Sequence, residues 1–237
     1  MSLEDRVAVI TGATGGLGRV VARRLAEEGA RLALISSDQH RLAALSSELG
    51  LPAERWLAHA ADLSIPADAQ AAAAAALAKF GRMDILLHLV GGWTAGKTVL
   101  QTPVEEVAAM LQQHLWTTFH VVQAFVPHLV ANGWGRIMAV SAPAATRPAA
   151  KAAPYAVGKA AQEALLLTLA RELTGSGVTV NLLVVRAIDA QGRRDRERTA
   201  ETANWTTPEE IASAIVYLCS DAAGVVNGAH IPLYGAP

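Results

Sequence analysis

The sequence predicts a single α/β domain: one doubly wound parallel sheet of about seven strands, with helices on both faces. Short apolar segments, rich in β-branched residues, alternate with longer helix-forming segments along all 237 residues. This alternation is typical of repeated βαβ units. No long Pro/Gly/Ser linker and no internal repeat divides the chain, so residues 1–237 are predicted to be one domain.

In the first half, the β-branched segment 7–10 predicts the first strand. Helix-forming sequence at 19–28 stops at Gly29, which we expect to be its C-terminal cap. The alanine-rich segment 67–80 carries Asp68 and Lys79, which favour a helix over a low-complexity linker. The remaining elements expected here are strands at 31–35 and 56–59 and a helix at 38–49.

In the second half, residues 85–90 form a continuous apolar segment, as expected for a strand buried on both faces. A long helix is predicted at 103–130. Further strands are expected at 136–141, 179–185 and 230–233, and further helices at 155–173 and 208–219.

The composition excludes several kinds of partner. The chain is 52% hydrophobic and 17% charged with a net charge of −1, so nothing favours nucleic acid or an anionic membrane. Residues 1–6 carry acids and do not form a signal peptide, and no apolar run reaches the roughly 18 residues of a membrane span. The single cysteine, Cys219, excludes an internal disulfide and is consistent with a cytoplasmic protein. We expect Cys219 to be a small buried apolar residue. No metal site is predicted.

A glycine-rich segment at 11–18, Thr-Gly-Ala-Thr-Gly-Gly-Leu-Gly, connects the first predicted strand to the first helix. The pyrophosphate of a dinucleotide binds at this position in doubly wound sheets. Gly12, Gly16 and Gly18 would allow a tight turn, a close approach to phosphate and packing of the helix on the sheet. Asp62 and Leu63 follow the third strand, where a carboxylate would face the adenine. These features predict dinucleotide binding.

Tyr155 and Lys159 lie four residues apart, one turn apart on the same helix face. A free phenol has a pKa near ~10, and a neighbouring ammonium lowers it by favouring the phenolate. Such a tyrosine can donate a proton to a developing alkoxide or accept one from an alcohol. The same spacing occurs on many solvated helix faces, so its meaning depends on the glycine-rich segment.

Together, Thr-Gly-x-x-x-Gly-x-Gly at 11–18, Asp62-Leu63, the Tyr155/Lys159 pair and Val180-Asn181 resemble the short-chain dehydrogenase/reductase family over residues 3–235. The resemblance implies a Rossmann-type fold, an NAD(P)(H) cofactor, a small-molecule substrate and a homo-oligomer, either a tetramer or a dimer. It assigns cofactor binding to Thr11, Gly12, Thr14, Gly16, Leu17, Gly18, Ser36, Ser37, Asp62, Leu63, Val90, Gly91, Tyr155, Lys159 and Ile188.

The end of the second strand bears on the choice of cofactor. NAD-using relatives place an acid at Ser36, and many NADP-using relatives place arginine at Ser37. Asp38 is a possible ribose acceptor, although a helix N-cap is the role we favour. Because an acid at Ser36 is missing and hydroxyls can bond a phosphate, we predict NADP(H) over NAD(H).

The catalytic end departs from the family. The usual serine is replaced by Ala142, and Ser141 would face away in the same strand register unless a bulge brought it in. The usual helix asparagine is His114, either a proton relay or a space-filling residue at a helix contact. We expect His88 to be a structural hydrogen-bonding residue beside the adenine pocket.

The substrate side is assigned to Trp93, Ala142 and Arg186. Trp93 is either a stacking surface for a flat heterocycle or a loop anchor. Arg186 faces the cofactor or substrate, or solvent, and residues 193–198 mix charges as a mobile loop does. The segments 90–96, 116–117 and 205–208 and Ala142 are locally similar to dihydropteridine reductase, a branch of the family without the serine.

Two functional hypotheses follow. The first is an NAD(P)H-dependent oxidoreductase that transfers hydride between nicotinamide and a small carbonyl, imine or quinonoid substrate. In it Tyr155 is the acid or base, Lys159 lowers its pKa and His114 relays protons. The alternative is a catalytically degenerate member of the family that binds nucleotide or acts as a structural or regulatory subunit.

Overall fold

The computed structural model describes residues 2–197, 199 and 202–235. Seven strands form one sheet in the order β3-β2-β1-β4-β5-β6-β7, and every neighbouring pair is parallel. The strands are β1 (Val7–Thr11), β2 (Arg31–Ser36), β3 (Trp56–Ala60), β4 (Ile85–His88), β5 (Gly135–Ser141), β6 (Val178–Val185) and β7 (His230–Leu233). The predicted fold class is confirmed.

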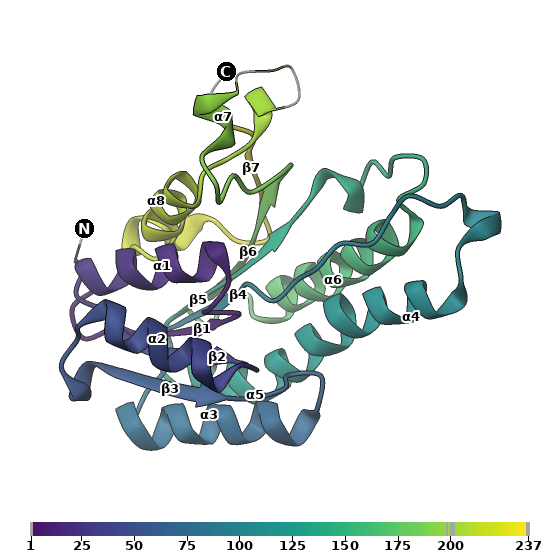
Figure 1. The fold of residues 1–237 in the computed structure, drawn as a ribbon. Helices are drawn as coiled ribbons and strands as arrows, with labels where there is room; N and C mark the ends of the chain where they lie inside the picture. Colours follow the sequence, from purple (N-terminus) through teal and green to yellow (C-terminus); the bar gives the residue numbers. More distant parts are fainter. Residues whose placement is uncertain (1, 198, 200–201, 236–237) are drawn as a thin grey trace.

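Helices cover both faces of this sheet (Figure 1). The helices are α1 (Gly16–Glu27), α2 (Gln39–Leu49), α3 (Pro66–Phe80), α4 (Val104–Leu111), α5 (Thr117–Ala131), α6 (Ala153–Glu172), α7 (Arg193–Arg196) and α8 (Pro208–Leu218). One buried cluster joins α1, α2 and α8 to the sheet, and a second joins α3, α5 and α6 to its other face. The chain therefore has the doubly wound architecture expected from its alternating segments.

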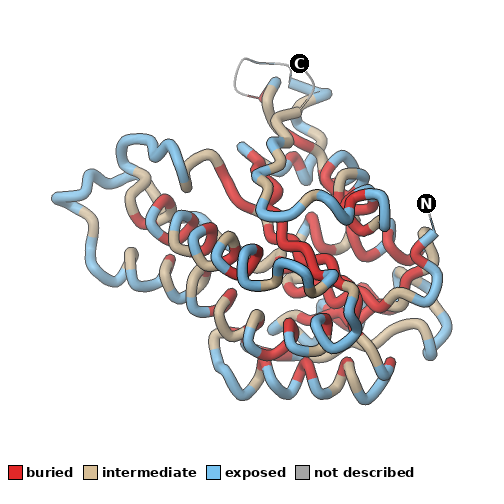
Figure 2. Tube along the Cα trace, turned by 180° about the vertical axis from the view of Figure 1, so that it is seen from behind, coloured by how far each residue is buried: buried red, intermediate tan, exposed pale blue. Residues whose placement is uncertain are grey.

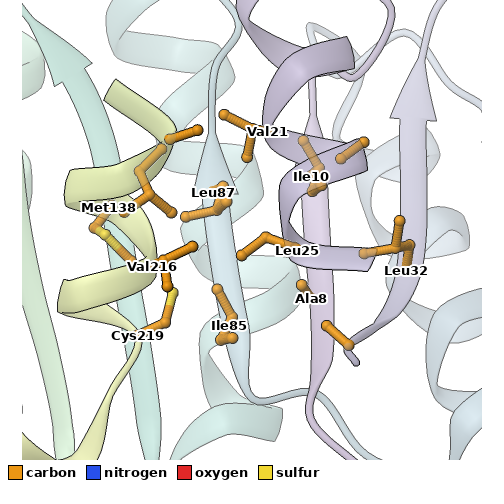
Figure 3. Packing of buried hydrophobic residues seen from close by; sticks show 14 of the residues in the cluster. Ala8, Ile10, Val21, Leu25, Leu32, Ile85, Leu87, Met138, Val216 and Cys219 are labelled. Carbon is orange, nitrogen blue, oxygen red and sulfur yellow. The ribbon is translucent and has the colours of Figure 1, made fainter. Parts of the chain in front are cut away.

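The central strands of the sheet are the most deeply buried part of the molecule, as the red segments in Figure 2 show. All residues of β1, β4 and β6 are buried, as expected for strands covered on both faces. Figure 3 shows one of these interfaces, where side chains of α1 and α8 pack over the strands: Val21, Leu25, Val216 and Cys219 over Ala8, Ile10, Ile85 and Leu87.

The strand order reverses at β1, which lies between β2 and β4. In open parallel sheets, ligands bind in the crevice beyond the carboxyl ends of the strands at such a reversal. The segments that follow β1 and β4 are the glycine-rich loop and residues 89–98. The topology therefore predicts that a ligand binds beside these two loops.

Several predicted elements need correction. α1 begins at Gly16, three residues before the predicted start, because Gly16, Leu17 and Gly18 already belong to the helix. The segment 103–130 is helical but contains a five-residue π-helix, η3 (Gln112–Trp116), between α4 and α5. The loop predicted at 193–198 contains α7, and its Arg194 bonds Glu210 at 2.8 and 2.9 Å; Arg198 lies outside the described residues.

Two expectations about burial can be compared with the structure. Cys219 is buried and free, and burial raises the pKa of its thiol to about 12, which makes it unreactive. No described helix combines the length and apolar character that a membrane crossing needs.

Candidate active site

The glycine-rich loop brings backbone from two strands into close contact. Gly12 has φ 70°, and a Cβ there would lie 2.9 Å from the carbonyl carbon of Leu89, which follows β4. A Cβ on Gly18 would lie only 2.4 Å from the Gly12 carbonyl oxygen. Glycine is thus required at both positions, one for its backbone conformation and the other for the approach of α1 to the loop.

A cavity of about 570 Å³ opens at this loop. Eight of the residues assigned to cofactor binding line it: Gly12, Thr14, Ser36, Ser37, Asp62, Leu63, Val90 and Gly91. Thr11, Gly16, Leu17 and Gly18 lie outside its lining and instead support the loop and helix α1. Ile188 is also outside it, 38% exposed and bridged to Thr206 beside β6. The cavity thus gathers the nucleotide-binding motifs, and Ile188, Tyr155 and Lys159 are separate from it.

Arg41, on the first turn of α2, also lines this cavity and was not predicted. Its Nη2 donates to the Thr14 carbonyl oxygen at 2.6 Å, and its backbone N–H donates to Asp38 Oδ1 at 3.0 Å. The interpretation of Asp38 as a helix N-cap is therefore confirmed. Arg41 lines the cavity together with Ser36 and Ser37 because of the turn that joins β2 to α2, and the sequence alone does not indicate this turn geometry.

Asp62 also lines the first cavity. Its Oδ1 accepts from the Ser64 backbone N–H at 3.0 Å, and hydrogen bonding with Ser64 lowers the pKa of the carboxyl. A carboxylate and an arginine thus lie on one cavity wall, with hydroxyls of Thr14 and Ser36 2.7 Å apart between the loop and β2.

A second cavity, of about 500 Å³, brings together the residues assigned to substrate and the candidate acid. Trp93, Ala142, Tyr155 and Arg186 all line it. They come from four separate segments of the chain, after β4, β5 and β6 and at the start of α6. Two further lining residues, Arg147 and Lys151, were not predicted, because no motif in the sequence marks either of them.

Tyr155 and Lys159 do not form the expected electrostatic pair. Burial raises the pKa of Tyr155, whereas a depression by Lys159 was predicted. Lys159 donates through Nζ to the Val140 carbonyl oxygen at 2.8 Å and to Gln162 Oε1 at 2.9 Å. Burial also lowers the pKa of Lys159 to about 8. The prediction was wrong in this structure because the ammonium bonds to β5 and to its own helix.

A buried hydrogen-bond chain continues from Lys159 to the π-helix. Gln162 Nε2 donates to Thr118 Oγ1 at 2.9 Å, and Thr118 Oγ1 donates to the His114 carbonyl oxygen at 2.5 Å. Gln162 and Thr118 are fully buried. Neither residue was predicted, although a Gln-Glu pair in an otherwise Ala/Leu-rich segment of α6 is a detectable signal.

His114 lies where the π-helix meets Tyr155, with ring centroids 5.7 Å apart in an edge-to-face arrangement. Its Nε2 donates to the Gly92 carbonyl oxygen at 3.1 Å, so Nδ1 is the unprotonated nitrogen, and it is buried without a partner. Burial, and then the charge of Lys159, lower the pKa of His114 to about 4. His114 is therefore neutral at pH 7, with a buried acceptor beside the candidate acid.

His88, at the end of β4, is the second buried histidine. Its Nδ1 lies 2.8 Å from Thr11 Oγ1, and its Nε2 is buried without a partner. Burial, then Lys159 and His114, lower its pKa to about 3. The expected hydrogen-bonding role is present, but His88 lines neither cavity and lies close enough to Lys159 and His114 to sense their charge.

The two histidines predict how stability depends on pH. Both have folded-state pKa values below the usual 6.5, so the unfolded chain binds more protons as the pH falls below 6.5. Stability should fall between pH 6.5 and 4, each histidine adding up to about 1.4 kcal/mol per pH unit. His88→Asn and His114→Asn should each flatten this slope in urea unfolding at pH 4.5–7.5. His59→Asn, on β3, serves as the control, and an unchanged slope in both variants would contradict the prediction.

Ser141 does not replace the missing serine. It pairs with Val184 in the regular β5–β6 register, with no bulge. Its hydroxyl donates to Glu163 Oε1 at 2.6 Å, and Glu163 Oε2 lies 2.8 Å from His230 Nε2. Ala142, rather than Ser141, lines the Tyr155 cavity.

Known proteins resemble this chain over most of its length. The family model for short chain dehydrogenases matches residues 6–201. D-threitol dehydrogenase of Mycolicibacterium smegmatis is 32% identical over 98% of this chain and 93% of its own. A 3-ketoacyl-(acyl-carrier-protein) reductase of Brucella melitensis, solved with NADH, has 28% identity and a TM-score of 0.87, covering 98% of both chains.

A third relative is a Pseudomonas aeruginosa short chain oxidoreductase, described as containing an atypical catalytic center and solved with NADPH. It has 28% identity and a TM-score of 0.87, covering 99% of this chain and 97% of that one. The matches span nearly the whole chain and agree with the seven-stranded Rossmann-type sheet. The chain is therefore a member of the short-chain dehydrogenase family and an oxidoreductase of that family's type.

Proposed function

We propose that this protein uses NAD(P)(H) to transfer hydride between nicotinamide and a small carbonyl, imine or quinonoid substrate, with Tyr155 as the acid or base. The observation that carries the proposal is the position of Tyr155 in the wall of the second cavity, with Ala142 and Trp93, one helix turn before the buried Lys159. Relatives solved with NADH and NADPH support the cofactor class.

The first cavity fits a dinucleotide. Gly12 and Gly18 leave no room for side chains, and the N-terminus of α1 at Gly15 and Gly16 suits a pyrophosphate. The charged Asp62 suits the adenine end. Arg41 and the hydroxyls of Ser36 and Ser37 offer donors to a 2′-phosphate, which supports NADP(H) over NAD(H).

When bound, the nicotinamide supplies or accepts the hydride. Reduction of a carbonyl to an alcohol also consumes one proton, which Tyr155 donates to the substrate oxygen. The raised pKa of Tyr155 keeps this proton in place at neutral pH. The hydrogen-bond chain through Gln162 and Thr118 fixes the Lys159 ammonium in position one helix turn after Tyr155.

Ala142 leaves the substrate oxygen without the serine hydroxyl usual in the family. A comparable donor in an oxyanion hole is worth about 2.7–4 kcal/mol. A substrate already activated for hydride attack, such as a quinonoid or iminium compound, depends less on that donor. The neutral His114, edge-on to Tyr155, adds a buried acceptor that can receive a proton through reorganised hydrogen bonds.

The cofactor can be tested directly by titrating the protein with NADPH and NADH and following fluorescence or melting temperature. We expect tighter binding of NADPH, and about tenfold or greater loss of NADPH affinity in Arg41→Ala because a charge-assisted contact is removed. NADH affinity should change little. Arg23→Ala, a variant in α1 outside the cavity, is the control.

Equal losses for both nucleotides in Arg41→Ala would contradict the 2′-phosphate role. Failure of both nucleotides to bind at millimolar concentration would contradict the proposed function itself and favour a degenerate member of the family.

A further inference from the structure

The second cavity carries an unusual distribution of charge. Three of its lining residues are cationic, Arg147, Lys151 and Arg186, and none is acidic. The whole chain, in contrast, has a net charge of −1. A cavity with cations on its wall concentrates anionic ligands and repels cationic ones.

These three side chains are not neutralised by the protein. Among the residues that the structure describes, none of the three forms an ion pair. Arg186 lies over the Tyr234 ring at 4.8 Å, a contact that orients the guanidinium and leaves its charge in place. Nearby cations outside the cavity are paired: Lys97 with Glu106, and Arg194 with Glu210.

The backbone holds one of these cations in a strained conformation. Lys151 has φ 63°, one of two non-glycine residues with a positive φ among those described. Its carbonyl oxygen accepts from the Gly96 N–H at 2.7 Å. This bond ties the segment that carries Trp93 to the segment that precedes Tyr155. Strain of this kind concentrates at ligand sites, where the surrounding structure maintains it.

The rest of the lining is largely apolar. It consists mainly of small side chains: Ala95, Ala142, Pro143, Ala144, Ala149, Ala150 and Ala152. Trp93 is 70% exposed at this cavity, which leaves its ring face available for stacking. The volume of about 500 Å³ is in the range of small-molecule sites.

We propose that the substrate is a planar cyclic compound bearing a carboxylate, whose ring stacks on Trp93 and whose carboxylate is bound by Arg147, Lys151 and Arg186. Arginine presents paired N–H donors that match a carboxylate, and lysine adds a mobile ammonium. The reacting carbon then lies toward Tyr155. This inference rests on the proposed oxidoreductase function and names the substrate class of that site.

The test compares an acid with its uncharged ester. The probes are 3-formylbenzoate and methyl 3-formylbenzoate, each with a flat ring and one aldehyde that NADPH and a proton reduce to an alcohol. We expect a higher kcat/KM for the acid. The triple variant Arg147→Gln, Lys151→Asn, Arg186→Gln should lower the acid-to-ester ratio at least about tenfold, with little change for the ester. Asparagine at position 151 tolerates the positive φ.

Arg171→Gln is the matched control. This exposed arginine lies in the last turn of α6, about 24 Å from Tyr155 at about 1.5 Å per residue. This substitution removes one positive charge from the helix that carries Tyr155, at a position outside the cavity lining. The ratio should stay at the wild-type value, and the preference for the acid should weaken with added salt.

A binding measurement separates this inference from the proposed function. Calorimetric titration with 3-(hydroxymethyl)benzoate and its methyl ester needs no turnover. Selective acid binding that the triple variant loses, with no reduction of any aldehyde, would support the anion site and contradict hydride transfer to a carbonyl by this protein. Equal handling of acid and ester, failure of both to bind, or an acid preference that survives the triple variant would overturn the inference.

Discussion

Tyr155→Phe should lower kcat for reduction by about a hundredfold to ten-thousandfold, the contribution typical of a positioned general acid. The substitution removes only the hydroxyl, and phenylalanine keeps the edge-to-face contact of the ring with His114. The fold and the glycine-loop cavity should therefore be unaffected. NADPH consumption with an aldehyde substrate, measured alongside NADPH binding, checks this expectation.

The control for this substitution is Tyr217→Phe. Tyr217 is 48% exposed on α8 and lines neither of the two cavities. It should retain wild-type kcat and nucleotide affinity. If Tyr155→Phe kept full activity with unchanged KM, the proton would have to come from another group, and the assignment of Tyr155 would be wrong.

The elements of the fold could be predicted largely from the sequence, because each strand and helix is marked by local composition. β7 has the predicted bounds, 230–233. β4 ends at His88 rather than at residue 90, since Leu89 and Val90 leave the sheet to line the first cavity. The π-helix at 112–116 was not predicted, because it is a single widened stretch inside a segment that is helical on both sides.

The site could be predicted only where a motif is local. The glycine loop and the Tyr155/Lys159 spacing are contiguous in sequence, and each lies at a cavity or beside one. Other positions depend on contacts formed only in the folded chain. Arg41 bonds the Thr14 carbonyl, Gln162 bonds Lys159, and the Lys151 carbonyl accepts from Gly96. Local sequence does not indicate these contacts. Cytoplasmic location, the oligomeric state and the local similarity to dihydropteridine reductase stay predictions.

A buried hydrogen-bond chain connects β5, helix α6 and the π-helix next to the residue that contacts Tyr155. Lys159 bonds β5 and Gln162, and Thr118 bonds the π-helix carbonyl of His114. The π-helix also carries Gln112 and Gln113, which line the first cavity. Helices α5 and α6 are thus cross-linked by polar contacts beside His114, whose ring contacts Tyr155. Such a satisfied network rigidifies the acid's surroundings.

Among substitutions that add one methyl group to the glycine-rich loop, Gly18→Ala should reduce stability and nucleotide binding the most. Its Cβ would lie 2.4 Å from the Gly12 carbonyl oxygen and 2.7 Å from that of Ala13, and both contacts are to backbone atoms. Because backbone cannot rotate away as a side chain does, α1 must move off the loop. Overpacking of this kind costs about 1–3 kcal/mol, occasionally more. The melting temperature should fall, and nucleotide affinity should fall with it.

Gly15→Ala is the matched control, since its Cβ would lie 3.3 Å from the same carbonyl oxygen with φ at −70°. It adds the same methyl group to the same loop, so it should unfold at nearly the wild-type temperature. Measuring nucleotide affinity well below each variant's melting temperature separates a distorted cavity from a lower folded population. If Gly18→Ala melted as Gly15→Ala does and bound nucleotide as the wild type does, the close approach of α1 would not be what shapes the cavity. A loss in Gly18→Ala that persists at low temperature would show that the fit of this helix to the loop sets nucleotide affinity.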